Sequence, residues 1–299
     1  MEFAPKPQGQ ENAKKMTRGQ FIKILTAFGI TAAIKPLDAL AKLPSMEQHK
    51  TRFVPTNEKF KNGELVFELR NENGERIGEF WPIKIINLVT KKTDPEIFTD
   101  NIEDIQTKLR GVATAPDGMT SGSLGSYEME GKSLSNGREC GDGQIKNYGI
   151  VTVIKNNHGT FDVNFTHKKE HEYDFDSLYN SVKQANGTLF FLPSIYRNGE
   201  YINSNNEVDK VLIRREVPVG PGTPKGEQLG VVLFDKMLSY DKAREAILGL
   251  DRPNASKTTH IYMLDGGKNW GQSIKEVNGI PTKMGTRNPE VVTNYLVFY

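Results

Sequence analysis

The sequence predicts an α+β fold in which one mixed, largely antiparallel sheet packs against a few helices. Three observations lead to this prediction: segments of alternating apolar and polar residues recur along the chain, 28 glycines and 15 prolines imply many turns, and one segment has a complete helix pattern. Alternation with a period of two is typical of half-buried strands, and frequent turns favour short strands over a helical bundle. We expect this domain to span residues 46–299, after a hydrophobic segment at 1–45.

The composition excludes several classes of protein. A chain of 299 residues can bury one large core or two modest ones. Its 39 Lys and Arg against 37 Asp and Glu leave a net charge of +2, without the clustered basic face that nucleic acids require, so we expect no nucleic-acid partner. The single cysteine, Cys140, excludes an intramolecular disulfide, a cysteine-based zinc site and a CxxC redox pair.

The N-terminal segment has the outline of a signal peptide. A cationic stretch at 14–18 precedes an apolar run at 21–34, and residues 38–41 end in a small-x-small pattern that suits cleavage before Lys42. The apolar run of about 14 residues is shorter than the roughly 20 that span a bilayer, so we expect no transmembrane span. If residues 1–41 are removed, the protein is extracytoplasmic, either periplasmic or secreted.

An alternative interpretation of the same segment is structural. Residues from Thr17 onward would form an amphipathic helix, with Thr17 as its N-cap, that packs on its own domain or on a partner. The protein would then belong to a virion or a cell-surface assembly.

Strands are predicted wherever the alternation is clear. Two are expected around a turn at Asn73-Gly74, because Asn-Gly between alternating segments is a strong hairpin signal. A second hairpin is expected around Asn278-Gly279, and a short helix at 100–109. The expected strands are 64–70, 75–89, 111–115, 148–155, 160–166, 188–196, 228–234, 260–264 and 291–298.

The clearest helix is predicted at 240–248. Ser239 can cap its N-terminus, Asp241 lies in the first turn where the helix dipole favours an anion, and Gly249 ends it. Its buried stripe is expected to consist of Ala243, Ala246 and Ile247.

Two candidate chemical motifs are set aside. His167 and His171 are four residues apart, as in a helical zinc pair, but the segment lies between a strand-like stretch and an acidic one and is expected to be a solvated loop. No phosphate-binding loop of the GxxxxGK[ST] type occurs in the sequence.

The strongest local signal is Asp265-Gly266-Gly267 directly after the apolar strand at 260–264. Such a strand brings a carboxylate to the rim of the sheet, beside backbone that can approach a ligand closely because glycine has no Cβ. An ordinary β-turn is the structural alternative.

Several motifs follow one another in a defined order in the last part of the chain. They are the strand at 228–234, the helix at 239–249, the segment at 261–267, Ser273, the turn at 277–279, Arg287 and the segment at 292–294. In the order and spacing of these motifs, 228–299 resembles the phosphodiester glycosidase family. The resemblance implies the family's α+β fold and a hydrolase that cleaves a sugar 1-phosphodiester.

Fewer residues carry the resemblance upstream. The segment at 111–118 occupies the place of a family strand that ends in Asn-Gly, so that Asp117 stands where the family has asparagine. Arg214 or Arg215 is positioned like the family's central arginine. After Asp-Gly-Gly, this chain continues with residues 268–270, Lys-Asn-Trp, where the family usually has Gly-Ser-Ser or Gly-Ser-Thr.

The resemblance implies catalytic roles for Asp265, Arg287 and Asp117. Breaking the bond between the anomeric carbon and the phosphate oxygen develops oxocarbenium character, which Asp265 can stabilise or attack. The departing phosphate is anionic, and Arg287 with one of Arg214 and Arg215 would bind it through paired N–H donors. Arg287 as a surface loop residue and Asn294 as a buried amide are the structural alternatives. The other expected substrate-binding residues are Gly266, Gly267, Lys268, Asn269, Trp270, Ser273 and Asn294.

We therefore expect a hydrolase that removes an α-linked sugar, such as N-acetylglucosamine, from a phosphodiester in a glycan or wall polymer. The alternative is a catalytically altered member that binds glycan or forms part of a phage tail or cell-surface complex, which Trp270 favours because its ring can stack on a sugar. The expected partner is a carbohydrate or glycan phosphodiester. We expect no cofactor; carboxylates and amides could hold a divalent metal, but no ligand spacing indicates one.

Overall fold

In the computed structural model, the described part of the chain starts at Thr51 and belongs to one unit, His49–Tyr299. The predicted N-terminal segment at 1–45 lies outside the described residues. The structure describes residues 51–60, 62–84, 86–98, 108–109, 113–116, 129, 131–145, 148–167, 174–202, 204–219, 225–252, 256–264, 273–278, 280–284 and 294–298.

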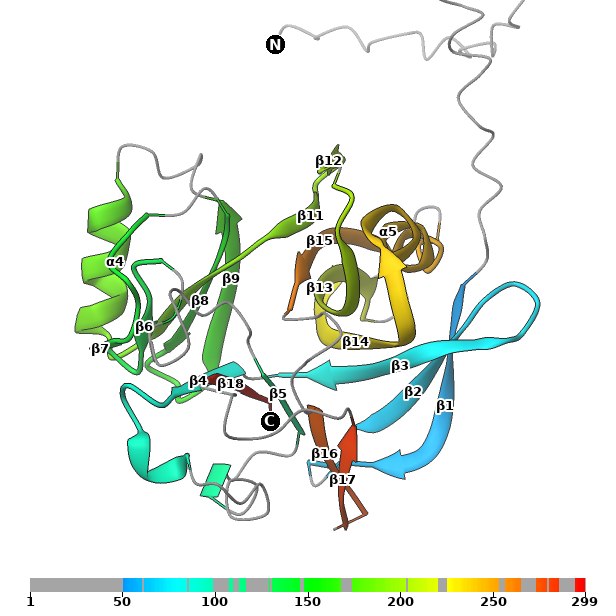
Figure 1. The fold of residues 1–299 in the computed structure, drawn as a ribbon, viewed down its shortest axis with the longest axis horizontal. Coiled ribbons are helices and arrows are strands. Elements are labelled where there is room, and N and C mark those ends of the chain that lie inside the picture. Colours follow the sequence, from blue (N-terminus) through cyan, green and yellow to red (C-terminus); the bar gives the residue numbers. More distant parts are fainter. Residues whose placement is uncertain are drawn as a thin grey trace, which may run out of the picture. The chain divides into compact units, whose positions relative to one another are not determined.

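The largest element is an eight-stranded sheet, called the large sheet below, in which every ladder is antiparallel (Figure 1). Its centre is the long hairpin of β13 and β14. The strand order is β1 (Arg52–Lys59), β2 (Leu65–Arg70), β3 (Arg76–Ile83), β14 (Lys225–Ser239), β13 (Glu207–Pro218), β15 (Lys257–Met263), β11 (Ser194–Arg197) and β12 (Glu200–Tyr201).

Two five-stranded sheets accompany it, and their ladders are also antiparallel. The C-terminal sheet has the order β17 (Ile280–Met284), β16 (Ser273–Val277), β5 (Ala113–Pro116), β18 (Asn294–Phe298) and β4 (Ile86–Thr90). The helix-covered sheet has the order β7 (Arg138–Glu139), β6 (Leu134–Ser135), β10 (Thr188–Leu192), β8 (Gly149–Lys155) and β9 (Phe161–His167). The largely antiparallel α+β prediction is confirmed, but the strands form three sheets where one was expected.

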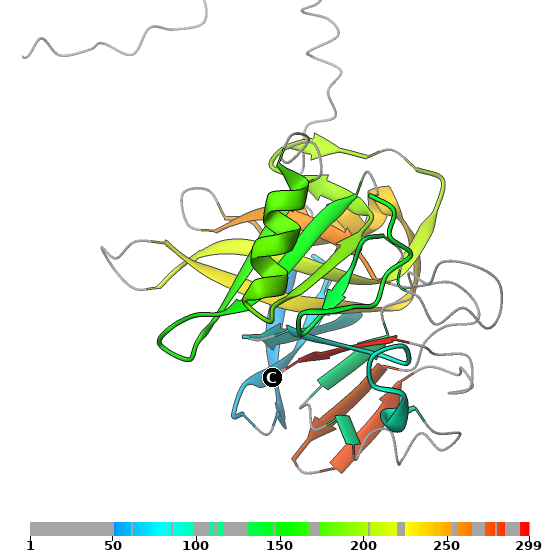
Figure 2. The same ribbon diagram turned by 90° about the vertical axis from the view of Figure 1, so that its left-hand side faces the viewer.

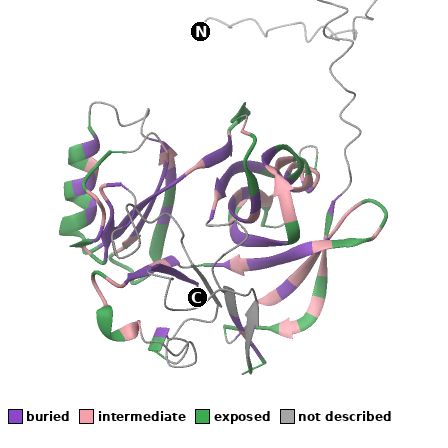
Figure 3. Ribbon diagram, viewed as in Figure 1, coloured by how far each residue is buried: buried purple, intermediate pink, exposed green. Residues whose placement is uncertain are grey.

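Each of two helices covers one sheet. Helix α4 (Phe175–Gln184) buries Phe175, Tyr179 and Val182 against the helix-covered sheet, and Figures 2 and 3 show it over those strands with its outward side exposed. Helix α5 (Tyr240–Leu248) buries Tyr240, Ala243 and Ile247 against the large sheet. A short 3-10 helix, η1, spans Pro95–Ile97. None of the helices among the described residues is long and apolar enough to cross a membrane.

The predicted helix at 240–248 is confirmed together with its cap. The Ser239 hydroxyl accepts a hydrogen bond from the Lys242 backbone N–H at 3.4 Å, and Gly249 is the C-cap. Both predicted Asn-Gly hairpins are also present, with Gly74 at φ 80° and Asn278 at φ 52°.

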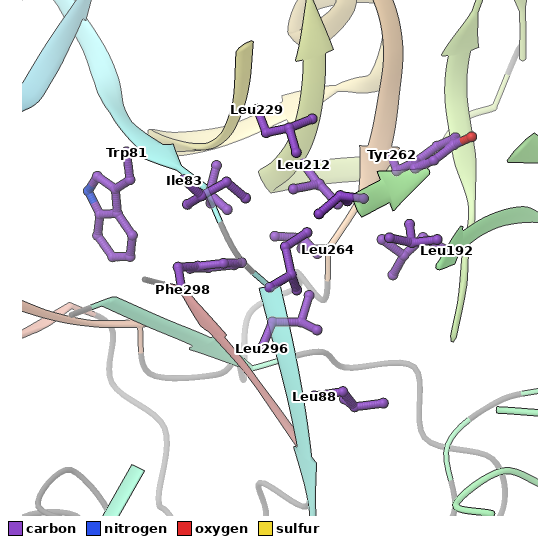
Figure 4. Packing of buried hydrophobic residues seen from close by; sticks show 14 of the residues in the cluster. Trp81, Ile83, Leu88, Leu192, Leu212, Leu229, Tyr262, Leu264, Leu296 and Phe298 are labelled. Carbon is purple, nitrogen blue, oxygen red and sulfur yellow. The ribbon is translucent and has the colours of Figure 1, made fainter. Parts of the chain in front are cut away.

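The main core lies where the other face of the large sheet meets the two smaller sheets. Figure 4 shows Leu264 among side chains from the large sheet, such as Leu212, and from the C-terminal sheet, such as Leu296 and Phe298. Trp81 is fully buried in this cluster. Because burying a large apolar side chain stabilises a fold by roughly 1.5–3 kcal/mol, this shared core holds the three sheets together.

Two expected strands were wrong because each is divided between two sheets. The segment at 75–89 forms β3 of the large sheet and β4 of the C-terminal sheet. The segment at 188–196 forms β10 and β11, which are separated by Pro193 and lie in different sheets. Proline cannot donate a ladder hydrogen bond, so the chain leaves one sheet there and enters the next.

Several elements were missed, including α4, β13 and β1, and one predicted helix is described only at its end. Helix α4 has apolar residues at 175, 178, 179 and 182, a helical spacing, but it begins in an acidic stretch that follows the segment 167–171, which was expected to be a loop. Strand β13 carries charged residues among its apolar ones. His167, assigned to a solvated loop, is instead a buried residue at the end of β9. Of the helix expected at 100–109, residues 108 and 109 are described and are helical.

Candidate functional site

The strand that precedes Asp265 is present and ends close to it. Strand β15 spans Lys257–Met263, and the next residue, Leu264, is fully buried and donates its backbone N–H to the Lys210 carbonyl oxygen at 3.1 Å. The last described residue before Asp265 is therefore anchored in the core. Residues 265–270 themselves, Asp265, Gly266, Gly267, Lys268, Asn269 and Trp270, lie outside the described residues.

Four strand ends meet at one edge of the C-terminal sheet. In the antiparallel register, Tyr295 lies opposite Pro116, which ends β5, so Asn294 at the start of β18 is at the same edge. On the other side of β5, Ile274 lies opposite Thr114, and Ser273 at the start of β16 lies opposite Met284 at the end of β17. We call this set of strand ends, Pro116, Ser273, Met284 and Asn294, the site edge.

Three segments that hold predicted site residues connect to the site edge. Asp117 directly follows Pro116, the segment at 265–272 directly precedes Ser273, and Arg287 is three residues after Met284. Asp117 and Arg287 lie outside the described residues. The predicted residues are thus far apart in sequence but belong to segments whose described ends are neighbours in one sheet.

Ser273 and Asn294 are part of the site edge itself. Ser273 is the first residue of β16, described by its backbone. Asn294 is fully buried and lies opposite Thr90 in the ladder between β18 and β4. Its burial agrees with the structural alternative, in which this amide belongs to the core.

Arg215 is held by the protein itself. Its Nη2 donates to the Leu250 carbonyl oxygen at 2.9 Å and to Ser256 Oγ at 3.1 Å, and it lies 3.5 Å from Asp251. Burial lowers the pKa of the Arg215 guanidinium, and the negative charge of Asp251 opposes this shift. These contacts tie the turn after α5 to the large sheet.

Arg214 lies on the opposite face of β13. It pairs with Glu227 of β14, and its guanidinium lies 5.7 Å from the centre of the Phe165 ring. It is opposite His260 in the ladder with β15, three residues or about 10 Å before the end of that strand at Met263. The structure therefore brings neither Arg214 nor Arg215 to the end of β15, and both are left out of the proposed phosphate site.

A buried charged cluster, which the sequence analysis missed, lies close to the site edge. Lys275 is two residues from Ser273, and its Nζ reaches Glu79 Oε2 at 2.9 Å and Glu58 Oε2 at 2.6 Å. Trp81 Nε1 donates to the same Glu79 carboxylate at 3.0 Å. The Lys275 and Glu79 side chains are only 5% and 8% exposed, so this ion pair joins β16 to the large sheet inside the protein.

The electrostatic environment of Glu79 keeps it ionised. Burial alone would raise the pKa of the Glu79 carboxyl, but hydrogen bonds from Trp81 and Lys275 and the positive charge of Arg76 outweigh burial and leave this pKa below its ordinary value. The sequence signal for this cluster was a glutamate between the apolar residues of 77–83 in strand β3, at a position that faces the core.

Two cavities, of about 300 and 330 Å³, are lined by described residues, and neither is lined by a predicted site residue. The described ranges hold no group of three His, Cys, Asp or Glu residues placed to bind a metal ion. No protein-family model matches the chain. A search of curated proteins also found no match. The resemblance to phosphodiester glycosidases therefore depends on the residues of this chain alone.

Proposed function

We propose that this protein is a hydrolase that cleaves a sugar 1-phosphodiester, such as an α-linked N-acetylglucosamine phosphodiester in a glycan or wall polymer. One observation carries the proposal: the segments that hold Asp117, Asp265 and Arg287 each connect to the site edge. Two carboxylates and an arginine in segments that connect to one sheet edge would suit this reaction.

Chain length supports the proposal further. Consecutive Cα atoms are about 3.8 Å apart, and an extended chain spans at most about 3.6 Å per residue. The Cα of Asp117 is therefore about 3.8 Å from that of Pro116, and the Cα of Arg287 is within about 11 Å of that of Met284. Trp270 is three residues before Ser273 and is limited to the same distance. The chain therefore tethers Asp117, Arg287 and Trp270 near the site edge, and Asp265 is bonded to Leu264, which follows β15.

The chemistry assigns one task to each group. Asp265 stabilises the positive charge that develops on the sugar as the bond between the anomeric carbon and the phosphate oxygen breaks. Arg287 binds the departing phosphomonoester, which leaves with the bonding electron pair and needs no proton from an acid. Water adds to the anomeric carbon, and Asp117 accepts its proton. The products are the free sugar and a phosphomonoester.

The test is hydrolysis of a synthetic N-acetylglucosamine 1-phosphodiester by the full-length protein and by Asp265→Asn. We expect the variant to lose activity and to keep its Tm. Asp162→Asn is the matched control, because Asp162 is exposed on β9, away from the site edge, and should leave activity unchanged. Equal activity in Asp265→Asn and wild type would refute the assignment. An inactive wild-type protein that still binds glycan would favour the alternative, a glycan-binding or structural member of a larger assembly.

The proposal includes an extracytoplasmic location. A polymer of the cell wall is outside the cytoplasm, and the cationic and apolar pattern at 14–34 is that of a secretory signal.

A further inference from the structure

A cavity of about 330 Å³ lies between the helix-covered sheet and β4, which is the outermost strand of the C-terminal sheet. Its volume is near the lower limit of roughly 300–1,000 Å³ for small-molecule sites. Three of its lining residues are buried, namely Ile86, Val153 and Thr188, and five are accessible, namely Asn87, Asn136, Asn186, Lys155 and Phe161.

Two tight turns bring Asn136 and Asn186 together. Asn136 begins the turn between β6 and β7 at φ 49°, and Asn186 follows the end of α4 at φ 51°. The Gly137 N–H donates to the Gly187 carbonyl oxygen at 2.7 Å, which joins the two turns. The Asn136 N–H donates to Thr188 Oγ1 at 3.2 Å. These contacts therefore fix the backbone of both turns, from which the two amide side chains project.

Four of the polar side chains that line the cavity are unpaired within the described part of the chain. Within the described residues, the amides of Asn87, Asn136 and Asn186 and the ammonium of Lys155 make no hydrogen bond or ion pair. Some asparagines in other turns are paired; the Asn71 side chain, for example, accepts a hydrogen bond from the Glu75 N–H at 2.9 Å. Three free amides around one cavity leave six N–H donors and three carbonyl oxygens available to a ligand.

The chemistry of this lining indicates its ligand. Each amide both donates and accepts, which matches neighbouring hydroxyl groups, and Phe161, at 38% exposure, offers an apolar ring to the C–H face of a pyranose. The lining has no carboxylate for a cation and a single lysine, too few for a polyanion. We infer that this cavity binds one sugar residue of a neutral glycan.

This site is separate from the site edge. Asn87 lies opposite Val297, and Ile86 opposite Phe298, whereas the site edge is at Asn294, opposite Thr90. Ile86 and Thr90 are four residues, or about 14 Å, apart along β4. The inference therefore does not depend on the proposed hydrolase activity.

Glycine variants test the site without straining the backbone. Glycine adopts a positive φ freely, so Asn136→Gly and Asn186→Gly remove an amide and keep the turn. Asn198→Gly is the matched control, because Asn198 has φ 46° in the turn between β11 and β12 and does not line this cavity. Phe161→Leu keeps an apolar side chain but removes the ring.

The assay is NMR of the full-length protein with ¹⁵N-labelled asparagine, titrated separately with glucose, galactose and N-acetylglucosamine. We expect at least one sugar to shift the side-chain amide signals of Asn87, Asn136 and Asn186 in a saturable way. Asn136→Gly, Asn186→Gly and Phe161→Leu should each weaken binding by about fivefold or more, while Asn198→Gly should not change it. The inference is overturned if none of the three sugars gives a saturable shift up to about 100 mM. Binding that is unchanged in both cavity glycine variants overturns it equally, since the sugar would then be held elsewhere.

Discussion

Replacing Lys275 with methionine should destabilise the protein strongly, because it leaves a buried carboxylate without its main partner. The Glu79 side chain is 8% exposed and has two contacts with Lys275 Nζ, at 2.9 and 3.0 Å. Removing one member of a buried ion pair costs about 3–5 kcal/mol. Trp81 and Arg76 still donate to Glu79, so we expect the lower part of this range.

The free energy of unfolding is measured with guanidinium and the Tm by heating, both followed by tryptophan fluorescence, for which the buried Trp81 is a reporter. For a domain of this size, a loss of about 3 kcal/mol lowers the Tm by roughly 6–12 °C. Lys183→Met is the matched control, because Lys183 and its partner Glu139 are 45% and 62% exposed, and a surface pair contributes at most about 1 kcal/mol.

A double variant, Lys275→Met with Glu79→Gln, separates the effect of breaking the ion pair from the other effects of replacing the lysine. Once the carboxylate is neutral, no unpaired charge is left buried, so the double variant should lose less stability than the sum of the single variants. The reasoning is refuted if Lys275→Met costs no more than Lys183→Met, or if the two single effects are simply additive.

Three further predictions concern pH, the proposed phosphate ligand and the N-terminus. Because the pKa of Glu79 is lower in the folded than in the unfolded protein, its carboxylate stabilises the fold above about pH 4.3, and this contribution is lost as the pH falls through the folded pKa. The difference in free energy of unfolding between wild type and Glu79→Gln should therefore become smaller in acid. A difference that stays constant with pH would contradict this prediction. Arg287→Lys should lower kcat/KM about tenfold on sugar phosphodiesters and much less on uncharged α-glycosides, because an ammonium cannot donate two parallel N–H···O hydrogen bonds to the phosphate. Equal losses on both substrates would show that Arg287 has a structural role. Intact mass of protein from its native producer should correspond to a chain that begins near Lys42, whereas a mass that includes residues 1–41 would exclude cleavage.

Local signals in the sequence predicted local structure correctly. The helix at 240–248 was predictable because its cap, its dipole and its apolar stripe all lie within eleven residues, 239–249. The hairpin at Asn278 was predictable because its turn requires a left-handed residue. In both cases the deciding interactions are between near neighbours in sequence.

The assignment of strands to sheets was not predictable in this way. Alternation shows that a strand has one buried face, but not which sheet it joins, so the transitions near Lys84 and at Pro193 were read as continuous strands. The same limit applies to the candidate site. The residues after β15 were proposed from the sequence, whereas the meeting of Pro116, Ser273 and Met284 depends on long-range register. Arg214 and Arg215 were assigned by position in a motif, and their partners Glu227 and Asp251 became visible only in three dimensions.

The place of β18 in the C-terminal sheet has a consequence for how the protein is made. This strand lies between β4 and β5, and its partner Ile86 is about 200 residues earlier in the chain than Phe298. At roughly 5–20 residues per second, β4 is synthesised about 10–40 s before the strand that pairs with it. Contacts this distant in sequence also slow the folding of a finished chain. During translation, the backbone hydrogen-bonding groups of β4 therefore have no β18 to pair with. The C-terminal sheet can be completed only late in biosynthesis.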